Sequence, residues 1–307
     1  IPNIPVNATW AQNGKTVAGG YGWGSDTNQL FWPEGLFVDD DQTMIIADWG
    51  NHRIIQWKMG DTNGQVVAGG NGYGNRLNQL NNPADVLIDK ETNSLIICDL
   101  WNRRVVRWSR HSGSTQGEIL IDNIDCHGLA MDEHRYLYIA DYKIHEVRRY
   151  QIGGNKNGTL VAGGNDEGDD LNQLNKPRYI FVDRQQAVYV SDWDNHRVMK
   201  WNKGAKEGIV VAGGHGRGYT LAQLSHPNGL IVDSLGTLYV ADTWNHRVMR
   251  WPQGAKQGTV IADGNGREEE EEETNGFAYP RGLSFDRHGN LYVVDFGNHG
   301  VLFFGIQ

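Results

Sequence analysis

The sequence predicts an all-β protein, a six-bladed β-propeller of four-stranded antiparallel blades whose ring is closed by the N-terminal strand. Three observations predict this fold: a motif that returns six times, short alternating strand patterns inside each repeat, and end repeats that complement each other. The composition agrees, because 40 glycines, 11 Trp, 12 Tyr and 8 Phe suit short strands joined by turns. The repeats fill residues 1–307 and leave no room for a second domain.

An aspartate followed by two variable residues and then Asn-His-Arg, or a variant of it, marks each repeat. The copies start about 50 residues apart, at Asp48–Arg53, Asp99–Arg104, Asp141–Glu146, Asp192–Arg197, Asp242–Arg247 and Asp295–Gly300. Four short strands at this period are typical of propeller blades rather than of a sandwich. Neighbouring blades bury each other's faces, so we expect all six to form together.

We name the strands of a blade a to d from the central channel outward. The fifth repeat predicts strands a, b and c at Gly229–Asp233, Leu238–Asp242 and His246–Trp251, after a strand d at Val210–Gly214. The sixth repeat supplies only strands a, b and c, at Gly282–Asp286, Leu291–Asp295 and His299–Phe304. A strand d around Thr16–Gly20 has no blade of its own, so we expect it to complete blade six and to protect its edge.

The motif resembles that of the NHL-repeat family of six-bladed propellers, which is named for its Asn-His-Leu-like triplet. The triplet stands as Asn51-His52-Arg53, Asn195-His196-Arg197 and Asn245-His246-Arg247, and is altered to Asn102-Arg103-Arg104, Ile144-His145-Glu146 and Asn298-His299-Gly300. The resemblance covers the whole chain and implies the fold. The family includes protein- and RNA-binding modules, bacterial sensor domains and a lyase that matures amidated peptides, so the fold does not specify the function.

Residues that recur in every blade are predicted to be scaffold. Equivalent positions lie on a wide ring, too far apart to share one ion. We therefore expect each motif histidine to satisfy the b–c turn of its own blade, beside an aspartate that caps backbone N–H groups and faces the arginine. These histidines are His52, His145, His196, His246 and His299. An aromatic residue five positions later is expected to be core: Trp57, Trp108, Tyr150, Trp201, Trp251 and Phe304.

Function is expected where the blades differ, on the face that carries the d–a loops and b–c turns. Four d–a loops have equal length: Gly20–Pro33, Gly70–Pro83, Gly164–Pro177 and Gly214–Pro227. The loop into blade three almost vanishes between Asn123 and Cys126, and the loop into blade six, Gly264–Pro280, contains the run Glu268–Glu273. We expect that run to be mobile and solvated; the functional alternatives are a contact for a basic partner or a weak calcium-responsive loop.

The residues that enter strand a are predicted to ring the channel mouth. Their chemistry differs from blade to blade, as expected of a site built on a symmetric frame. They are Glu34, Ala84 then Asp85, His127, Arg178 then Tyr179, Asn228 and Arg281. Glu34, His127 and Asn228 belong to alternate blades and could reach one anion, one calcium ion or another divalent metal. The alternative is a solvated channel mouth without a ligand.

The b–c turns of the same face carry aromatic residues: Trp49, Trp101, Tyr142, Trp193, Trp244 and Phe296. Exposed rings could stack on sugar faces or anchor a protein partner. The alternative is that each ring covers its own turn against the neighbouring d–a loop.

Charge and processing signals bear on partners and location. Six of the nine net negative charges belong to the Glu268–Glu273 run, and no basic face indicates a nucleic-acid partner. No apolar stretch is long enough for a membrane span. Sequons predict glycosylation at Asn7 and Asn157, which favours a secreted protein. Adjacent blades could bring Cys98 and Cys126 together, but the sequence leaves both a disulfide and two free thiols open.

We therefore expect a non-enzymatic binding or assembly module, extracellular, that recognises a protein or glycan partner, or further copies of itself, with the face of d–a loops and b–c turns. The alternative is a metal-dependent lyase or hydrolase with its site at the channel mouth. The lyase of the NHL family has a metal-bearing channel lined by histidines, whereas only His127 stands at this mouth. No catalytic residue is predicted.

Overall fold

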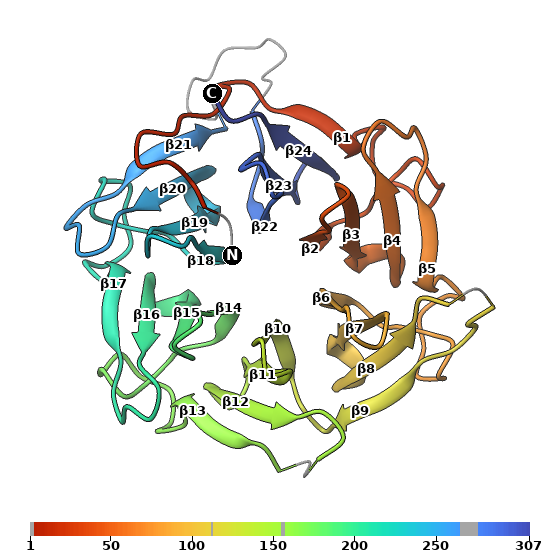
Figure 1. Cartoon of the computed structure of the whole chain (residues 1–307), viewed down its shortest axis with the longest axis horizontal. Coiled ribbons are helices and arrows are strands. Elements are labelled where there is room, and N and C mark those ends of the chain that lie inside the picture. The colour runs from red at the N-terminus through yellow and green to blue at the C-terminus, as the bar shows by residue number, and fades with distance from the viewer. Residues whose placement is uncertain (1–2, 112, 155–156, 265–275) are drawn as a thin grey trace.

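The chain folds into six four-stranded antiparallel sheets arranged in a ring around a common axis (Figure 1). The structure is a computed structural model, and it describes residues 3–111, 113–154, 157–264 and 276–307. The predicted all-β propeller is confirmed. The run Glu268–Glu273 lies outside the described residues, and the expectations about it stay predictions.

The first three blades follow one another along the chain. Blade one contains β2 (Pro33–Val38), β3 (Thr43–Asp48), β4 (Arg53–Lys58) and β5 (Gln65–Gly69). Blade two contains β6 (Pro83–Asp89), β7 (Ser94–Asp99), β8 (Arg104–Ser109) and β9 (Glu118–Asp122). Blade three contains β10 (Cys126–Met131), β11 (Tyr136–Asp141), β12 (Glu146–Gln151) and β13 (Thr159–Gly163).

The last three blades complete the ring. Blade four contains β14 (Pro177–Val182), β15 (Val188–Asp192), β16 (Arg197–Trp201) and β17 (Ile209–Gly213). Blade five contains β18 (Pro227–Val232), β19 (Leu238–Asp242), β20 (Arg247–Trp251) and β21 (Thr259–Asp263). Blade six contains β22 (Pro280–Phe285), β23 (Leu291–Asp295), β24 (Gly300–Phe304) and the N-terminal strand β1 (Lys15–Gly19).

The hydrophobic core lies between blades rather than inside them. One cluster joins Ile45 and Ile54 of blade one to Val86 and Ile97 of blade two, and the other described clusters follow the same rule. The recurrent aromatic residue of strand c is buried in every blade, as predicted: Trp57, Trp108, Tyr150, Trp201, Trp251 and Phe304. A blade that lacked its neighbour would expose this apolar face, so the six sheets depend on one another.

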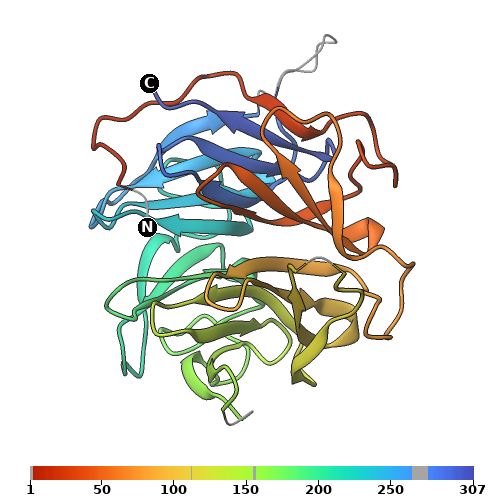
Figure 2. The ribbon, with the colours of Figure 1, turned by 45° about the vertical axis from the view of Figure 1, so that its right-hand side comes forward.

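The N-terminal residues close the ring, as predicted. Strand β1 pairs antiparallel with β24, from Lys15 opposite Phe303 to Gly19 opposite Gly300. The segment before β1 runs beside the C-terminal residues (Figure 2), where the Trp10 indole N–H donates to the carbonyl of Gly289 over 2.9 Å. Blade six thus receives its outer strand and part of its core from the start of the chain.

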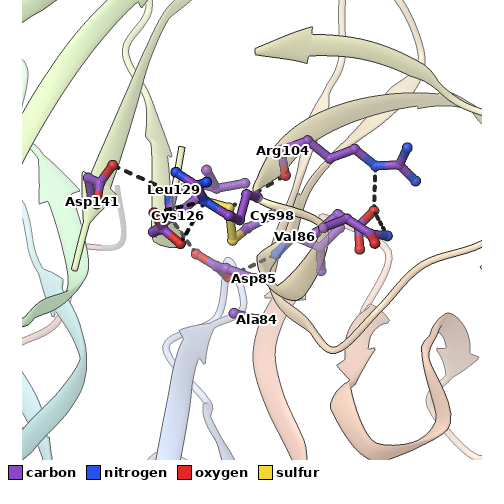
Figure 3. Close-up of a disulfide and its surroundings, with 12 residues drawn as sticks. Ala84, Asp85, Val86, Cys98, Arg104, Cys126, Leu129 and Asp141 are labelled. Atoms are coloured by element: carbon purple, nitrogen blue, oxygen red, sulfur yellow. Dashed lines mark hydrogen bonds and ion pairs between the residues drawn. A yellow bond between two sulfur atoms is a disulfide. The ribbon is translucent and has the colours of Figure 1, made fainter. Parts of the chain in front are cut away.

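A disulfide joins Cys98 in β7 to Cys126 in β10, which decides the question that the sequence left open (Figure 3). The two Cα atoms lie 5.8 Å apart and both side chains are fully buried. The bond connects blade two to blade three at the junction where the d–a loop is shortest. It therefore replaces contacts that a longer loop makes at the other junctions.

We expect the disulfide to contribute about 3 kcal/mol to the free energy of unfolding, because it closes a loop whose ends are 28 residues apart. Replacing both Cys98 and Cys126 with alanine should lower the denaturation midpoint accordingly, and a reductant should lower it only in the unmodified protein. Denaturant titration with and without reductant measures both effects. Equal midpoints for the two proteins, or two free thiols found in the native protein by mass spectrometry, would contradict the prediction.

Candidate functional site

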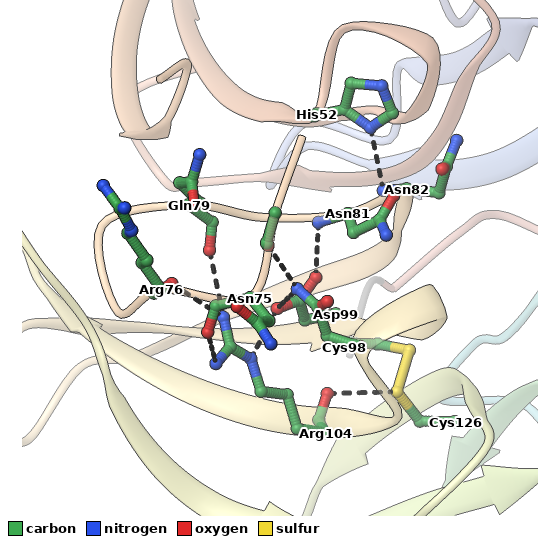
Figure 4. Close-up of polar contacts among 12 residues, drawn as sticks. His52, Asn75, Arg76, Gln79, Asn81, Asn82, Cys98, Asp99, Arg104 and Cys126 are labelled. Atoms are coloured by element: carbon green, nitrogen blue, oxygen red, sulfur yellow. Dashed lines mark hydrogen bonds and ion pairs between the residues drawn. A yellow bond between two sulfur atoms is a disulfide. The ribbon is translucent and has the colours of Figure 1, made fainter. Parts of the chain in front are cut away.

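The repeated motif fixes the d–a loops that build the mouth face. In blade two, Arg104 donates from Nε to the buried carboxylate of Asp99 over 2.6 Å, and Asn102 donates to the same carboxylate (Figure 4). The remaining Arg104 nitrogens donate to the carbonyls of Asn75, Arg76 and Gln79 in the preceding loop. Arg53, Arg197 and Arg247 make the equivalent contacts in blades one, four and five. The motif thus clamps four loops in one geometry.

The motif histidines serve more than the b–c turn of their own blade. In blades one, four and five the backbone N–H group closes that turn, as that of His52 does with the carbonyl of Trp49, but the imidazoles contact the next blade. His52 ends a 3₁₀ turn, Trp49–Asn51, in the left-handed conformation with φ of 53°, and is therefore not part of the following strand. Its Nδ1 accepts the backbone N–H of Asn82 in the loop that leads into blade two (Figure 4). The same bond is made by His145, His196, His246 and His299 with Lys176, His226, Tyr279 and Trp32.

Three motifs are irregular, and they are compensated differently. Blade three has Glu146 in the arginine position, and this glutamate pairs with Arg148 of the same strand. Blade two has Arg103 in the histidine position, and this arginine pairs with Asp125 at 3.1 Å beside the disulfide. Blade six has Gly300 in the arginine position, and burial without an arginine partner raises the pKa of Asp295 to about 6. The motif therefore departs from the regular pattern in blades two, three and six.

The innermost strands approach closely where they enter the channel. A Cβ atom on Gly282 would lie 2.8 Å from the carbonyl oxygen of Glu34 in the next blade, which is too close for any other residue. Glycines at 35, 128 and 229 meet neighbouring strands in the same way. The residues at the adjacent positions are consequently brought together across the channel.

Glu34 is the centre of this cluster. Its carboxylate lies 3.4 Å from Nδ2 of Asn228, 3.6 Å from Nε2 of His127, and 3.6 Å and 3.8 Å from the guanidiniums of Arg281 and Arg178. Glu34 is 4 % exposed, and Asn228 and His127 are also buried. Five blades therefore contribute to one polar cluster, and the predicted convergence of Glu34, His127 and Asn228 occurs together with two arginines.

The cluster has more positive than negative charge. Burial, with the nearby guanidiniums, holds the pKa of His127 well below its usual value, so the imidazole is neutral at pH 7. Burial and the neighbouring Arg281 lower the pKa of Arg178 to about 10, which still leaves this arginine charged at pH 7. Two guanidiniums thus share the single carboxylate of Glu34.

Asp85 and Tyr179 fasten strands to one another. The Asp85 carboxylate accepts the backbone N–H groups of Val86 and Leu129 at 2.9 Å and 2.8 Å, and so joins blade two to blade three (Figure 3). Burial is the main reason that the pKa of Asp85 is raised to about 7. The Tyr179 hydroxyl donates to the carbonyl of Ala84. Both side chains are buried. The guanidiniums of Arg178 and Arg281 lie nearer the solvent.

Aromatic rings continue the site outward on the mouth face. Trp101 contacts Trp49, Trp49 contacts Trp32, and Trp32 stacks on Phe296 with ring centroids 6.1 Å apart. The guanidinium of Arg281 lies over Phe296, and that of Arg178 lies 3.6 Å above Trp193. We call Trp101, Trp49, Trp32 and Phe296 the aromatic arc. Trp101 is 60 % exposed and Trp32 is 40 % exposed.

Of the remaining predicted rings, one is exposed, as a partner-binding ring would be, and two are covered by neighbouring side chains. Trp244 is exposed and packs against His226, whereas Trp193 is buried under the arginines and Tyr142 is half-buried near His127.

Sequence reasoning missed Trp32, which lies directly before the proline that starts strand a. Its φ of 50° is left-handed, an uncommon conformation for a bulky residue, and the bond from its N–H to His299 holds it there. The equivalent residues Asn82, Lys176, His226 and Tyr279 share this conformation. The signal available in the sequence was that the residue directly before this proline varies from blade to blade.

The donor set does not fit a metal ion. No group of three or more His, Cys, Asp or Glu side chains is placed to hold one within the described ranges. The two guanidiniums beside Glu34 also oppose a cation, because their charges would repel it. The metal-dependent alternative therefore gains no support from this cluster.

Further cavities lie between the outer strands of adjacent blades. One of about 600 Å³ is lined by β13 and Trp201, and another of about 610 Å³ is lined by β17 and Trp251. Their linings repeat from blade to blade, so they follow from the fold and do not distinguish a site.

Both sequon asparagines, Asn7 and Asn157, are exposed. No helix of the described chain is long and apolar enough to cross a membrane.

Comparisons with known proteins support the fold and leave the ligand open. The NHL repeat family matches residues 224–251 and 277–302. No curated protein sequence matches the chain. A Bacteroides thetaiotaomicron protein of unknown function and an auxiliary nutrient binding protein of the same organism share 17 % and 16 % identity, with TM-scores of 0.75 and 0.73. The matches cover 97 % of this chain and 76 % and 77 % of theirs.

Virginiamycin B lyase from Staphylococcus aureus shares 10 % identity, with a TM-score of 0.55 over 97 % of this chain and 99 % of its own. Identities this low show a shared fold alone, and that fold includes both binding proteins and lyases. The motif in each blade, the repeat match and the six four-stranded sheets together identify the chain as an NHL-repeat six-bladed β-propeller.

Proposed function

We propose that the chain is a non-enzymatic, extracellular binding protein that recognises a glycan with its mouth face. The aromatic arc is the observation that carries this proposal, because its tryptophans lie beside the channel mouth with exposed ring surface. A flat ring with free surface can stack against the apolar face of a sugar. Exposed aromatic surface of this kind commonly marks a binding site.

Two further features support this function and location. A buried disulfide forms and persists in an oxidising compartment, as outside the cell, and both predicted glycosylation sites are exposed. The nutrient-binding proteins with the same fold show that such a propeller can serve as a binding protein.

The test is a glycan array probed with the unmodified protein and with Trp101→Ala. Trp101 is largely exposed, so its truncation should change stability little but weaken glycan binding about tenfold or more, the effect of losing a central aromatic contact. Leu235→Ala is the matched control, because Leu235 is an exposed apolar residue of an a–b turn, at the opposite end of the strands. Binding that survives in Trp101→Ala, or capture of proteins but of no glycan, would contradict the proposal.

A further inference from the structure

The polar cluster beneath the aromatic arc has unused hydrogen-bonding capacity. Among the described residues, Nε and Nη1 of Arg281, Oδ1 of Asn228 and Nδ1 of His127 are buried without a hydrogen-bond partner. Buried polar atoms are nearly always paired in folded proteins, so each unpaired atom needs an explanation. Here several such atoms occur within one cluster at the mouth of the channel.

The two arginines are held in place by contacts that do not use their hydrogen-bond donors. The guanidinium of Arg178 lies flat over Trp193, and that of Arg281 lies over Phe296 at 4.6 Å and over Trp193 at 5.2 Å. Stacking orients a guanidinium plane while leaving its N–H edge free, and that edge matches the two oxygens of a carboxylate. The side chain of Arg178 is 25 % exposed, so its donors can be reached from the solvent.

The charges favour an anion over a neutral ligand. Glu34 is the carboxylate shared by both arginines, at distances longer than a direct hydrogen bond. The neutral imidazole of His127 adds no charge at pH 7. Asp194 also attracts Arg178, but it is itself paired with Lys176 at 2.6 Å. Two guanidiniums therefore share the carboxylate of Glu34 in a site where water only partly screens their charge.

We propose that the channel mouth binds the carboxylate of an acidic sugar, which Arg178 and Arg281 hold while the aromatic arc contacts the sugar ring. The inference rests on the proposed glycan binding and specifies the class of glycan. Glu34 competes with the ligand for the same two guanidiniums. Its removal therefore strengthens binding, although it deletes a residue of the cluster.

The experiment compares two ligands that differ only in charge: a galacturonate trisaccharide and the same trisaccharide with every carboxylate methyl-esterified. Isothermal titration should show that the unmodified protein binds the acid at least about tenfold more tightly than the ester, since hydrogen bonds between charged groups are the stronger kind. The preference should shrink at high salt, because added ions screen a partly exposed pair.

Three variants test the assignment. Arg281→Gln should abolish the preference, so that the acid and the ester bind with equal affinity. Glu34→Gln should tighten binding of the acid several-fold. Arg184→Gln removes an exposed arginine from an a–b turn on the other face and should match the unmodified protein. Thermal melting confirms that each variant is folded.

The outcomes separate the two proposals. Equal binding of acid and ester by the unmodified protein, or a preference that persists in Arg281→Gln, would overturn the carboxylate site while leaving glycan binding intact. A tighter acid complex in Glu34→Gln supports it. Trp101→Ala should weaken both ligands, and the absence of any sugar binding by the unmodified protein would overturn both proposals.

Discussion

Deleting residues 1–20 should destabilise the propeller by about 5 kcal/mol or more, because it removes a strand together with buried core residues. The deletion takes away β1, which pairs with β24, and leaves blade six with an unpaired outer edge. It also removes Trp10 and Ile4, which are buried against Tyr239 and Phe285. Truncating one large buried side chain alone typically costs about 3–5 kcal/mol.

Thermal and denaturant melting of the truncated and full-length chains measures this effect, and a fall in Tm of about 10 °C or more is expected. Trp10→Ala separates the core packing from the strand, because it leaves the β1 ladder in place. Val6→Ala is the control within the same segment, since Val6 is 81 % exposed. A truncated protein that melts within a degree or two of the full chain would show that β1 does not stabilise the ring.

Replacing Arg247 with methionine should lower the free energy of unfolding by about 3–5 kcal/mol. The arginine is almost fully buried and donates to the carboxylate of Asp242, which would become an unpaired buried charge. It also donates to the carbonyls of Tyr219, Thr220 and Gln223, which would lose their partner. The d–a loop into blade five would then lose its anchor.

The control is Arg250→Met on the same strand, where the arginine donates one hydrogen bond, to the carbonyl of Ala8, and about 1 kcal/mol is expected. A double-mutant cycle with Asp242→Asn isolates the pair. The double variant should lose less stability than the sum of the two single variants. The reason is that removing both partners leaves no unpaired charge in the buried interior. Additive losses would mean that the pair is not the source of the effect.

Several features of the fold could be read from the sequence because they repeat. The aspartate motif, the strand-c aromatic residue and a short buried strand such as Leu238–Asp242 each recur with the blade, and local hydrogen bonding and burial act in a similar way in each copy. Ring closure was also predictable. The N-terminal strand has no blade of its own and the sixth repeat lacks its outer strand, so pairing the two completes the ring. The residues of the channel mouth followed from their place at the start of strand a.

The tertiary structure decided what happens between blades. The bond from His52 to Asn82, the disulfide between Cys98 and Cys126 and the contacts of Glu34 all join residues far apart along the chain.

The sequence by itself determined the number of blades, their strands and which positions are scaffold, since each depends on periodicity within one repeat. Only the tertiary structure decided that the arginines at the mouth share one carboxylate and stack on Trp193 and Phe296. The physical reason is that the close approach of the innermost strands, which glycines such as Gly282 permit, sets those distances. The spacing of residues along the sequence does not determine these distances.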